Sequence, residues 1–443
     1  MFSRGKWGIH PETHKTATAD RPIESMKLPE KVIIPIRQHI GAPCEPVVKK
    51  GDLVKTGQLI AVGNAAVSSN THASVSGTVT EIAVKPHPIC GEDMAIVIES
   101  DGADQWEENI PTNRDWQAMT NEEILSIIKN AGIVGMGGAA FPTYVKLNPP
   151  KDKQIDTLII NAAECEPFLT ADHRVMLEYA QSVVSGIKIM KKILGVQNII
   201  VGVEDNKMDA VKVMREAFGD LAQVIPMKTQ YPQGAEKMII KTLLQRSVSS
   251  GQLPMDVGVV VQNVGTAAAV ADAVIKGIPL VERIVTVSGS MIKEPKNLKV
   301  RIGTSFADVI AACGGFEGTP GKVIMGGPMM GIAEYTVDVP VIKGTSGILA
   351  ISVKEAKKME ESPCIHCGKC VSVCPMGLNP SMLSILAEKE IIDEARDEYN
   401  IVDCMECGCC SFVCPAKRHI VHHIKYTKKL LADKAAREKG ATK

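Results

Sequence analysis

The fold is decided by the stretch Gly132-Ile-Val-Gly-Met-Gly-Gly-Ala-Ala-Phe-Pro-Thr-Tyr-Val-Lys146, in which four of the first seven residues are glycine. Because glycine lacks a Cβ atom, the backbone N–H groups of such a loop can turn toward an anion. Lys146 can add a positive charge for a phosphate. The apolar segment 156–161 predicts a buried strand, which ends in the polar stretch Asn161-Ala-Ala-Glu-Cys-Glu-Pro167. Open α/β sheets bind ligands at this carboxyl edge of their strands.

The segments around this stretch alternate between strand and helix patterns. Thr170 is expected to cap a helix from Ala171 to about Leu194. Predicted strands at 198–203, 223–227 and 257–262 alternate with predicted helices at 207–218, 236–244 and 267–276. This order predicts a mostly parallel sheet with right-handed crossovers. Two further polar stretches, 231–236 and 262–266, are expected at the same edge. Upstream, Thr120 and Glu123 predict a capping box for a helix that stops at Gly132.

Nine of the 13 cysteines fall between Cys364 and Cys414, in two runs of the form C-x2-C-x2-C-x3-C-P. This pattern is typical of two-cluster ferredoxins, in which the fourth cysteine of each run serves the other cluster. The short spacers let three thiolates of one loop converge, and the following helix carries the fourth. Two [4Fe–4S] clusters are therefore predicted, one held by Cys364, Cys367, Cys370 and Cys414, the other by Cys404, Cys407, Cys410 and Cys374.

Other roles for these cysteines fit the sequence less well. A disulfide framework is not expected in a long chain whose first residues lack the apolar segment of a secretory signal. Zinc sites usually have two cysteine pairs separated by a long gap. Cys409 is expected to be a packed thiol that binds no iron, and His366 an exposed loop residue. The scattered cysteines are expected to be small buried residues: Cys44, Cys90, Cys165 and Cys313.

The glycine stretch is not a standard dinucleotide fingerprint, because Ala140 stands where G-x-G-x-x-G needs its third glycine. The combination GxxGxGGAxFPTxxK, NAxExEP and YxxGxE instead resembles the flavoprotein subunit of respiratory complex I, which binds FMN and NADH. The resemblance implies that the FMN phosphate is held by Gly135, Gly137, Gly138 and Lys146. It implies that the flavin is surrounded by Asn161, Glu164, Gln262, Asn263 and Thr266. It further implies a nicotinamide nucleotide pocket, with Phe141 stacking on a ring, formed by Phe141, Glu166, Tyr231, Gly234 and Glu236. The chain departs from the family pattern at Ala163, Ala235 and Pro149.

The flanking segments also resemble known domains. Residues 31–110 carry short strand patterns with turn glycines and resemble a biotinyl/lipoyl-type barrel-sandwich domain. Their hairpin 64–70 contains no lysine to modify, so a scaffold or docking role is expected rather than a carrier role. Residues 284–350 resemble the β-grasp domain of the same complex I subunit, with a tight packing loop at 326–331.

The predicted fold class is multidomain α/β. Its parts are an N-terminal arm (1–30), a barrel-sandwich domain (31–110), a Rossmann-like FMN/NADH domain (111–283), a β-grasp domain (284–350), a two-cluster ferredoxin-like helical domain (351–422) and a basic tail (423–443). With the opening stretch Phe2-Ser-Arg-Gly-Lys-Trp-Gly-Ile-His-Pro11, this order resembles the C subunits of the Rnf complex over essentially the whole chain.

That resemblance implies a subunit that passes electrons between NAD(H), FMN and two [4Fe–4S] clusters. The Rnf complex exchanges electrons between ferredoxin and NAD while moving Na⁺ or H⁺ across a membrane. The implied partners are NADH, the integral membrane and iron–sulfur subunits of the complex and, indirectly, ferredoxin. The implied location is peripheral, at the cytoplasmic face of the membrane. No catalytic acid or base is assigned, because the cofactors carry the chemistry.

Composition narrows the remaining possibilities. Fifty basic residues balance fifty acidic ones, so no nucleic-acid partner is expected. The apolar runs are shorter than the roughly 18 residues that a membrane span needs. The basic tail is either a docking element for a partner or an anionic membrane, or a solvated helix. Two alternative functions stay open: a soluble flavin/iron–sulfur reductase such as a cobalamin reductase, and a non-enzymatic electron-transfer adaptor.

Overall fold

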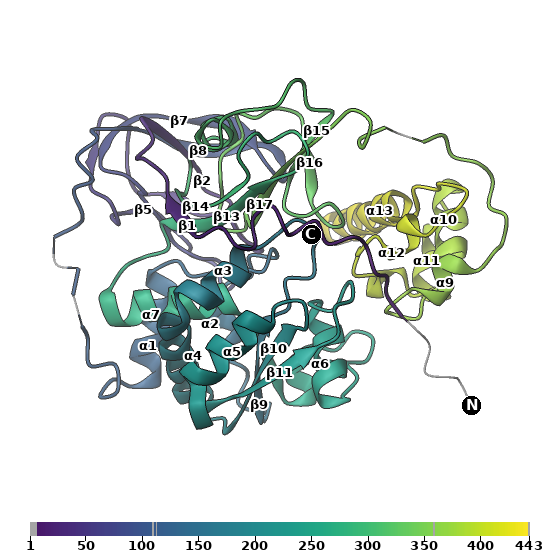
Figure 1. The fold of residues 1–443 in the computed structure, drawn as a ribbon, viewed down its shortest axis with the longest axis horizontal. Helices are drawn as coiled ribbons and strands as arrows, with labels where there is room; N and C mark the ends of the chain where they lie inside the picture. Colours follow the sequence, from purple (N-terminus) through teal and green to yellow (C-terminus); the bar gives the residue numbers. More distant parts are fainter. Residues whose placement is uncertain (1–6, 109, 112, 358, 442–443) are drawn as a thin grey trace.

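The computed structural model describes residues 7–108, 110–111, 113–357 and 359–441. The predicted arm and tail, and the opening stretch from Phe2, therefore lie partly outside the described residues. In Figure 1 the α/β domain lies below, the barrel-sandwich and β-grasp sheets lie above it, and the helical cluster domain lies to the right. Residues 7–22 form an extended arm that runs between these parts.

The α/β domain is built on a parallel four-stranded sheet in the order β11-β10-β9-β12. The strands are β9 (Thr157–Ala162), β10 (Asn198–Glu204), β11 (Gln223–Met227) and β12 (Val259–Asn263). Asn263 pairs with Asn161, so the polar ends of the two strands lie side by side. Around the sheet lie α1 (Asn121–Asn130), α2 (Thr143–Lys146), α3 (Ala171–Glu178), α4 (Ala180–Leu194), α5 (Met208–Phe218), α6 (Glu236–Leu244), α7 (Val264–Lys276) and the short 3-10 helices η1 (Gly219–Leu221) and η2 (Pro254–Val257). The predicted parallel sheet is confirmed.

The predicted capping box is also present. The Thr120 hydroxyl accepts from Glu123 N, and the Glu123 carboxylate accepts from Thr120 N at 2.7 Å. Gly132 follows the helix with φ +70°, a conformation that favours glycine.

The predicted ends of the helix after Thr170, Ala171 and Leu194, are confirmed, but the predictions of an unbroken helix and of a side-chain cap from Thr170 are wrong. The helix is divided at Tyr179 into α3 and α4, next to the point where the Glu178 carboxylate accepts the Ile23 N–H of the arm. The Thr170 hydroxyl instead donates to Asn297 Oδ1 at 2.9 Å. Glu164 caps α3 in its place, since its carboxylate accepts from the N–H groups of Asp172 and His173. A tertiary contact thus removed the local cap that the sequence offers.

The barrel-sandwich domain consists of two antiparallel sheets. One has the order β2-β8-β7-β4 and the other β3-β5-β6. Their strands are β2 (Lys31–Pro35), β3 (Glu45–Pro46), β4 (Leu53–Val54), β5 (Leu59–Val62), β6 (Thr71–His72), β7 (Gly77–His87) and β8 (Gly91–Ser100). Cys90 lies in the turn between β7 and β8 and is exposed, so its predicted burial is wrong. Cys44 and Cys313 are buried and Cys165 is half-buried.

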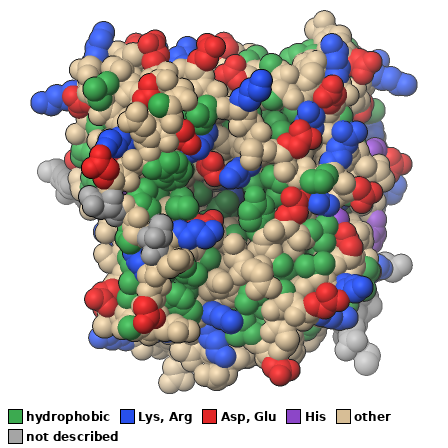
Figure 2. Space-filling model, turned by 60° about the vertical axis from the view of Figure 1, so that its left-hand side comes forward, with side chains coloured by type: hydrophobic (Ala, Val, Ile, Leu, Met, Phe, Trp, Pro, Cys, Tyr) green, Lys and Arg blue, Asp and Glu red, His purple; other side chains and the backbone are tan. Residues whose placement is uncertain are grey.

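Figure 2 shows the molecule turned so that the left-hand side of Figure 1 comes forward. This face is hollowed between its upper and lower parts. Hydrophobic side chains gather around the hollow, and Lys and Arg side chains lie near it.

The β-grasp sheet has the order β1-β14-β13-β17-β15-β16. Its elements are β13 (Glu282–Ser288), β14 (Lys296–Arg301), α8 (Phe306–Ala312), β15 (Lys322–Met325), β16 (Ile332–Glu334) and β17 (Gly347–Ile351). The edge strand β1 (Ile23–Ser25) comes from the arm and pairs parallel with β14. The arm is therefore part of this sheet, which the sequence pattern did not predict.

The cluster domain is helical, with a core that includes Leu383, Leu386, Ile401 and Ile424. It contains α9 (Lys369–Ser372), α10 (Pro380–Glu388), α11 (Ile392–Asp397), η3 (Ile401–Asp403), α12 (Cys409–Phe412) and α13 (Ile420–Ala441). Because α13 begins at Ile420, the predicted boundary at 422 falls inside a helix, and the basic tail continues that helix. Lys428 and Lys434 pair with Glu406 and Asp393 of the same domain. In the part of the chain that the structure describes, no helix combines the length and apolarity that a membrane crossing requires.

Helices α4 and α7 cross closely at Gly186. A Cβ atom at this position would lie 1.8 Å from the Ala267 carbonyl oxygen. We expect Gly186→Ala to push the helices apart and lower the free energy of unfolding by about 1–3 kcal/mol. Thermal unfolding followed by circular dichroism checks this. Lys188→Ala, an exposed position on the same helix, is the control. An unchanged midpoint for Gly186→Ala would contradict the close packing.

Candidate functional site

The glycine loop is open on one side and packed on the other. Gly138 has φ +107°, and no protein atom lies within 4 Å of where its Cβ would be. A Cβ on Gly137 would lie 3.5 Å from the Asn263 side chain. A hydrogen bond joins the two ends of the loop, because the Gly135 N–H donates to the Phe141 carbonyl at 2.8 Å. The open side leaves backbone groups accessible to a ligand.

The peptide groups of Met136 are held on both sides. Its N–H donates to Thr266 Oγ1 at 2.8 Å, and its carbonyl accepts from Arg283 Nη2 at 3.1 Å. These contacts fix the direction of the peptide that leads into Gly137. Thr266 was a predicted site residue, whereas Arg283 was not.

The polar strand ends lie beside this loop. The Asn263 side chain accepts from the N–H groups of Gly265 and Thr266 and so caps α7. Asn161, its neighbour across the sheet, donates to the Gly234 carbonyl at 2.7 Å. The structure thus brings Gly137, Asn161, Asn263 and Thr266 to one edge, at the positive end of the α7 dipole.

One buried amide at this edge has no protein partner. Gln262 is 2% exposed, and its Nε2 makes no hydrogen bond to a described residue. A buried donor without an acceptor costs free energy. Flavin carries carbonyl and ring-nitrogen acceptors, and its phosphate suits an open glycine loop at a helix N-terminus. The residues present at this edge therefore fit FMN.

Buried charged side chains lie next to the glycine loop and the strand ends, on the side of the protein interior. Burial, with the Glu164 charge, raises the pKa of Asp172 to about 7. The Asp172 carboxylate accepts from Asn263 Nδ2 at 2.6 Å. Burial lowers the pKa of Lys343 to about 8, and Lys343 Nζ donates to the carbonyls of Asn70 and Gly132. Lys343 and Arg283 were missed because a single basic residue near a strand carries no recognisable pattern.

Two predicted residues of the loop and nucleotide pocket pair with each other. Lys146 Nζ lies 2.5 Å from Glu236 Oε1, which joins the end of α2 to the start of α6. Phe141 is half-buried beside the loop.

Glu166 and Tyr231 point away from the glycine loop. The carboxylate oxygens of Glu166 accept from the N–H groups of Met329 and Met330 in the β-grasp domain. Burial raises the pKa of Glu166 to about 7, and these N–H groups partly offset the effect. The Tyr231 hydroxyl donates to the Cys407 carbonyl at 2.8 Å. Glu166 therefore binds the β-grasp domain and Tyr231 binds the cluster domain.

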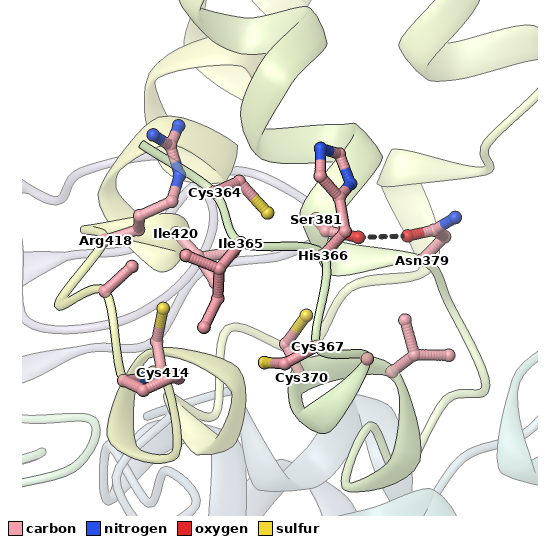
Figure 3. Close-up of a pocket in the computed structure, with 14 residues that line it drawn as sticks. Cys364, Ile365, His366, Cys367, Cys370, Asn379, Ser381, Cys414, Arg418 and Ile420 are labelled. Atoms are coloured by element: carbon pink, nitrogen blue, oxygen red, sulfur yellow. Dashed lines mark hydrogen bonds between the residues drawn. The ribbon is translucent and has the colours of Figure 1, made fainter. Parts of the chain in front are cut away.

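The first set of cysteines surrounds a cavity of about 130 Å³. Figure 3 shows the sulfur atoms of Cys364, Cys367, Cys370 and Cys414 around this common space. Four cysteine sulfurs around a cavity of this size fit an iron–sulfur cluster.

The second set of cysteines also converges. Burial raises the pKa of Cys404 to about 11, and the nearby thiols of Cys407 and Cys374 contribute. The pKa of Cys410 is raised by burial and by neighbouring thiols, those of Cys404, Cys407 and Cys374. A cluster would convert such thiols to thiolates. Cys409 is fully buried, and His366 is exposed.

Comparison with known proteins agrees with this geometry. The chain is 55% identical over 441 residues to the C subunit of the proton-translocating ferredoxin:NAD(+) oxidoreductase complex of Clostridium ljungdahlii, covering 99% of this chain and 96% of that protein. It is 48% identical over 437 residues to the C subunit of the Na(+)-translocating ferredoxin:NAD(+) oxidoreductase complex of Acetobacterium woodii, covering 98% of each. The chain belongs to this family of C subunits.

Four family models match consecutive parts of the chain. They are the RnfC barrel sandwich hybrid domain (4–103), the Nuo51 FMN-binding domain (128–272), the SLBB domain (284–333) and the 4Fe-4S dicluster domain (356–415). The fold is similar to a solved NAD+-reducing [NiFe]-hydrogenase chain, with a TM-score of 0.50, 19% identity and coverage of 66% of this chain and 60% of that chain. The matched domains assign FMN and two [4Fe–4S] clusters to the chain.

Loss of the Arg283 side chain should weaken FMN binding. Arg283→Gln removes the donor that holds the Met136 carbonyl, and we expect the dissociation constant of FMN to rise about tenfold. Titration of flavin-free protein with FMN, followed by flavin fluorescence, measures it. Arg215→Gln is the matched control, because Arg215 also donates to a carbonyl in this domain, that of Val224. Equal affinity in both variants would contradict the role of Arg283.

The cysteine assignment can be tested by metal content. Cys414→Ser should remove one cluster and about half of the iron and acid-labile sulfide, whereas Cys409→Ser should keep both clusters. Iron and sulfide analysis after anaerobic purification measures this. Half-loading of Cys409→Ser, or full loading of Cys414→Ser, would show that the ligand sets are assigned wrongly.

Proposed function

We propose that this chain is the NADH- and FMN-handling subunit of a membrane-bound, ion-translocating ferredoxin:NAD oxidoreductase. In this role it passes electrons between NAD(H), FMN and its two [4Fe–4S] clusters. The observation that carries the proposal is the direct contact between the domain with the glycine loop and a cluster loop, through the 2.8 Å hydrogen bond from Tyr231 to the Cys407 carbonyl. The two relatives above support it, since they match over nearly their whole length.

The protein residues serve to bind and orient the cofactors. Gly135, Gly137, Gly138 and Lys146 hold the FMN phosphate, while the strand ends at Asn161 and Gln262 to Thr266 line the ring. The nicotinamide nucleotide lies near Phe141, Gly234 and Glu236. FMN supplies the exchange between the hydride of NADH and the single electrons of iron–sulfur clusters.

The two clusters act in a fixed order. Cys407 and Cys410 are buried, and Tyr231 of the α/β domain contacts the loop that carries them. Cys367 is exposed, and the neighbouring Ile365 is 64% exposed. Electrons therefore pass between the flavin and the cluster of Cys374, Cys404, Cys407 and Cys410, and reach a partner subunit through the cluster of Cys364, Cys367, Cys370 and Cys414.

The remaining domains position the chain in the complex. The barrel-sandwich and β-grasp domains act as scaffolds, and the chain is held at the cytoplasmic face of the membrane by its partner subunits. An adaptor without flavin is disfavoured by the open glycine loop and the unpartnered Gln262 amide. A cobalamin reductase is disfavoured by the near full-length match to the two C subunits.

An anaerobic titration with NADH tests this function. We expect the flavin absorbance to bleach and the electron paramagnetic resonance (EPR) signals of reduced clusters to appear in the same FMN-loaded sample. A flavin that stays oxidised in excess NADH, or clusters that stay oxidised beside a reduced flavin, would refute the proposal. Rapid reduction of cob(II)alamin would favour the alternative reductase.

A further inference from the structure

The contact between the α/β domain and the cluster domain is compact and rich in sulfur. Its buried members are Ile9, Tyr231, Cys407 and Cys409. Half-buried residues pack around them: Cys165, Met329, Val373, Met405 and Val413. We call this contact the junction. It joins four parts of the molecule, because its members come from the arm, the α/β domain, the β-grasp domain and the cluster domain.

Tyr231 lies at the centre of the junction. It is 1% exposed, and its hydroxyl donates to the carbonyl of the cluster ligand Cys407 at 2.8 Å. Its own carbonyl lies 3.9 Å from the Cys409 sulfur. A buried tyrosine hydroxyl needs a partner, and here the partner is the cluster loop itself.

The arm closes the junction from the side. Ile9 and Tyr231 exchange two backbone hydrogen bonds, of 2.8 and 2.9 Å. The Gly8 N–H donates to the Val373 carbonyl at 2.9 Å, directly before the cluster ligand Cys374. A side chain on Gly8 would lie 2.5 Å from the Tyr231 carbonyl oxygen, and Gly8 has φ +77°. The arm therefore links the Tyr231 backbone to the residue before Cys374. This is a second connection to the cysteine set that includes Cys407.

Glu166 of the α/β domain supports the same loop through residues of the β-grasp domain. Its carboxylate accepts from Met329 N at 3.0 Å and from Met330 N at 2.8 Å. Met329 in turn packs on Gly408, where a Cβ would lie 3.1 Å from the Met329 carbonyl oxygen. Lys15 Nζ of the arm donates to the carbonyls of Glu164 and Glu166 and so holds the backbone that carries the Glu166 side chain.

We infer that Tyr231 and Glu166 are positioning residues for electron transfer, which hold the loop 404–410 against the flavin edge of the α/β domain. This inference rests on the proposed function and says where electrons enter the cluster domain.

The bonded route from the flavin edge to the cluster loop is short. Asn161 at the flavin edge donates to the Gly234 carbonyl, three residues along the chain lead to Tyr231, and its hydroxyl contacts Cys407. Bonded contacts couple a donor and an acceptor better than a gap does.

The hydroxyl also influences the cluster electrostatically. Its positive end points at the peptide of a cluster ligand, and a reduced cluster carries one more negative charge. Hydrogen bonds and dipoles near the ligands help to set cluster potentials. The Tyr231 dipole should therefore favour the reduced state of the cluster held by Cys374, Cys404, Cys407 and Cys410.

Tyr231→Phe is the decisive variant, because it removes the hydroxyl and keeps the ring. In FMN-loaded protein with both clusters, we expect the rate of cluster reduction relative to flavin reduction to fall several-fold in stopped-flow traces. We also expect the EPR signal of one cluster to change and its midpoint potential to become more negative. Tyr426→Phe is the matched control, since it removes a hydroxyl that bonds to Glu390 on the exposed side of the cluster domain. It should leave all three readouts unchanged.

Glu166→Gln provides a second test. Its amide keeps the shape of the carboxylate but can accept one of the two N–H groups through its only oxygen. We expect faster hydrogen exchange at Met329, Met330 and the 404–410 loop, and a smaller fall in the same rate ratio. Exchange can be measured even if Tyr231→Phe loads its clusters poorly.

The outcomes separate this inference from the proposed function. If NADH fails to bleach the flavin of the unaltered protein, the proposed function fails, while the EPR signal and potential can still be measured with dithionite. If the flavin bleaches but Tyr231→Phe matches the unaltered protein in rate ratio, EPR signal and potential, the inference is overturned. It is overturned equally if Tyr231→Phe raises only the NADH concentration needed for flavin reduction, because Tyr231 would then act in the nucleotide pocket.

Discussion

The site depends on one constraint: a loop that must expose its backbone to a ligand cannot use its own side chains to hold its shape. The glycines between Gly132 and Gly138 leave the loop open, so its support comes from outside. Thr266 holds the N–H of Met136, Arg283 holds its carbonyl, and Lys343 holds the carbonyl of Gly132. Buried cations are costly unless they find acceptors, and here the loop supplies the acceptors. The glycine loop and the β-grasp domain therefore stabilise each other.

Two carboxylates separated by one residue show how a strand end can serve two neighbours. Glu164 caps α3, and Glu166 binds the N–H groups of Met329 and Met330. The polar stretch after β9 thus organises the flavin domain on one side and the cluster contact on the other. A substitution at either residue would change more than ligand binding, because each carboxylate satisfies backbone groups that would otherwise be unpaired.

Much of the fold was predictable because it follows from local patterns. The alternation of strands and helices gave the parallel sheet, and Thr120 with Glu123 marked the start of α1. The cysteine spacing placed Cys414 beside the loop of Cys364 to Cys370, 44 positions away from the nearest of them. The failures involve tertiary contacts. The Thr170 hydroxyl left its helix for Asn297, β1 joined a sheet formed more than 250 residues later, and Tyr231 turned toward Cys407. No local pattern encodes these partners.

The position of the arm has a consequence for biosynthesis. Residues 8–25 contact Tyr231, pair with Asn297 to Lys299, and reach Val373. A ribosome produces this segment hundreds of residues before its last partner. The arm therefore stays without these partners until residue 373 has emerged, and the domains synthesised in between fold ahead of its docking. Docking of the arm is thus a late event in maturation, because it requires that the flavin-bearing and iron-bearing parts have come together.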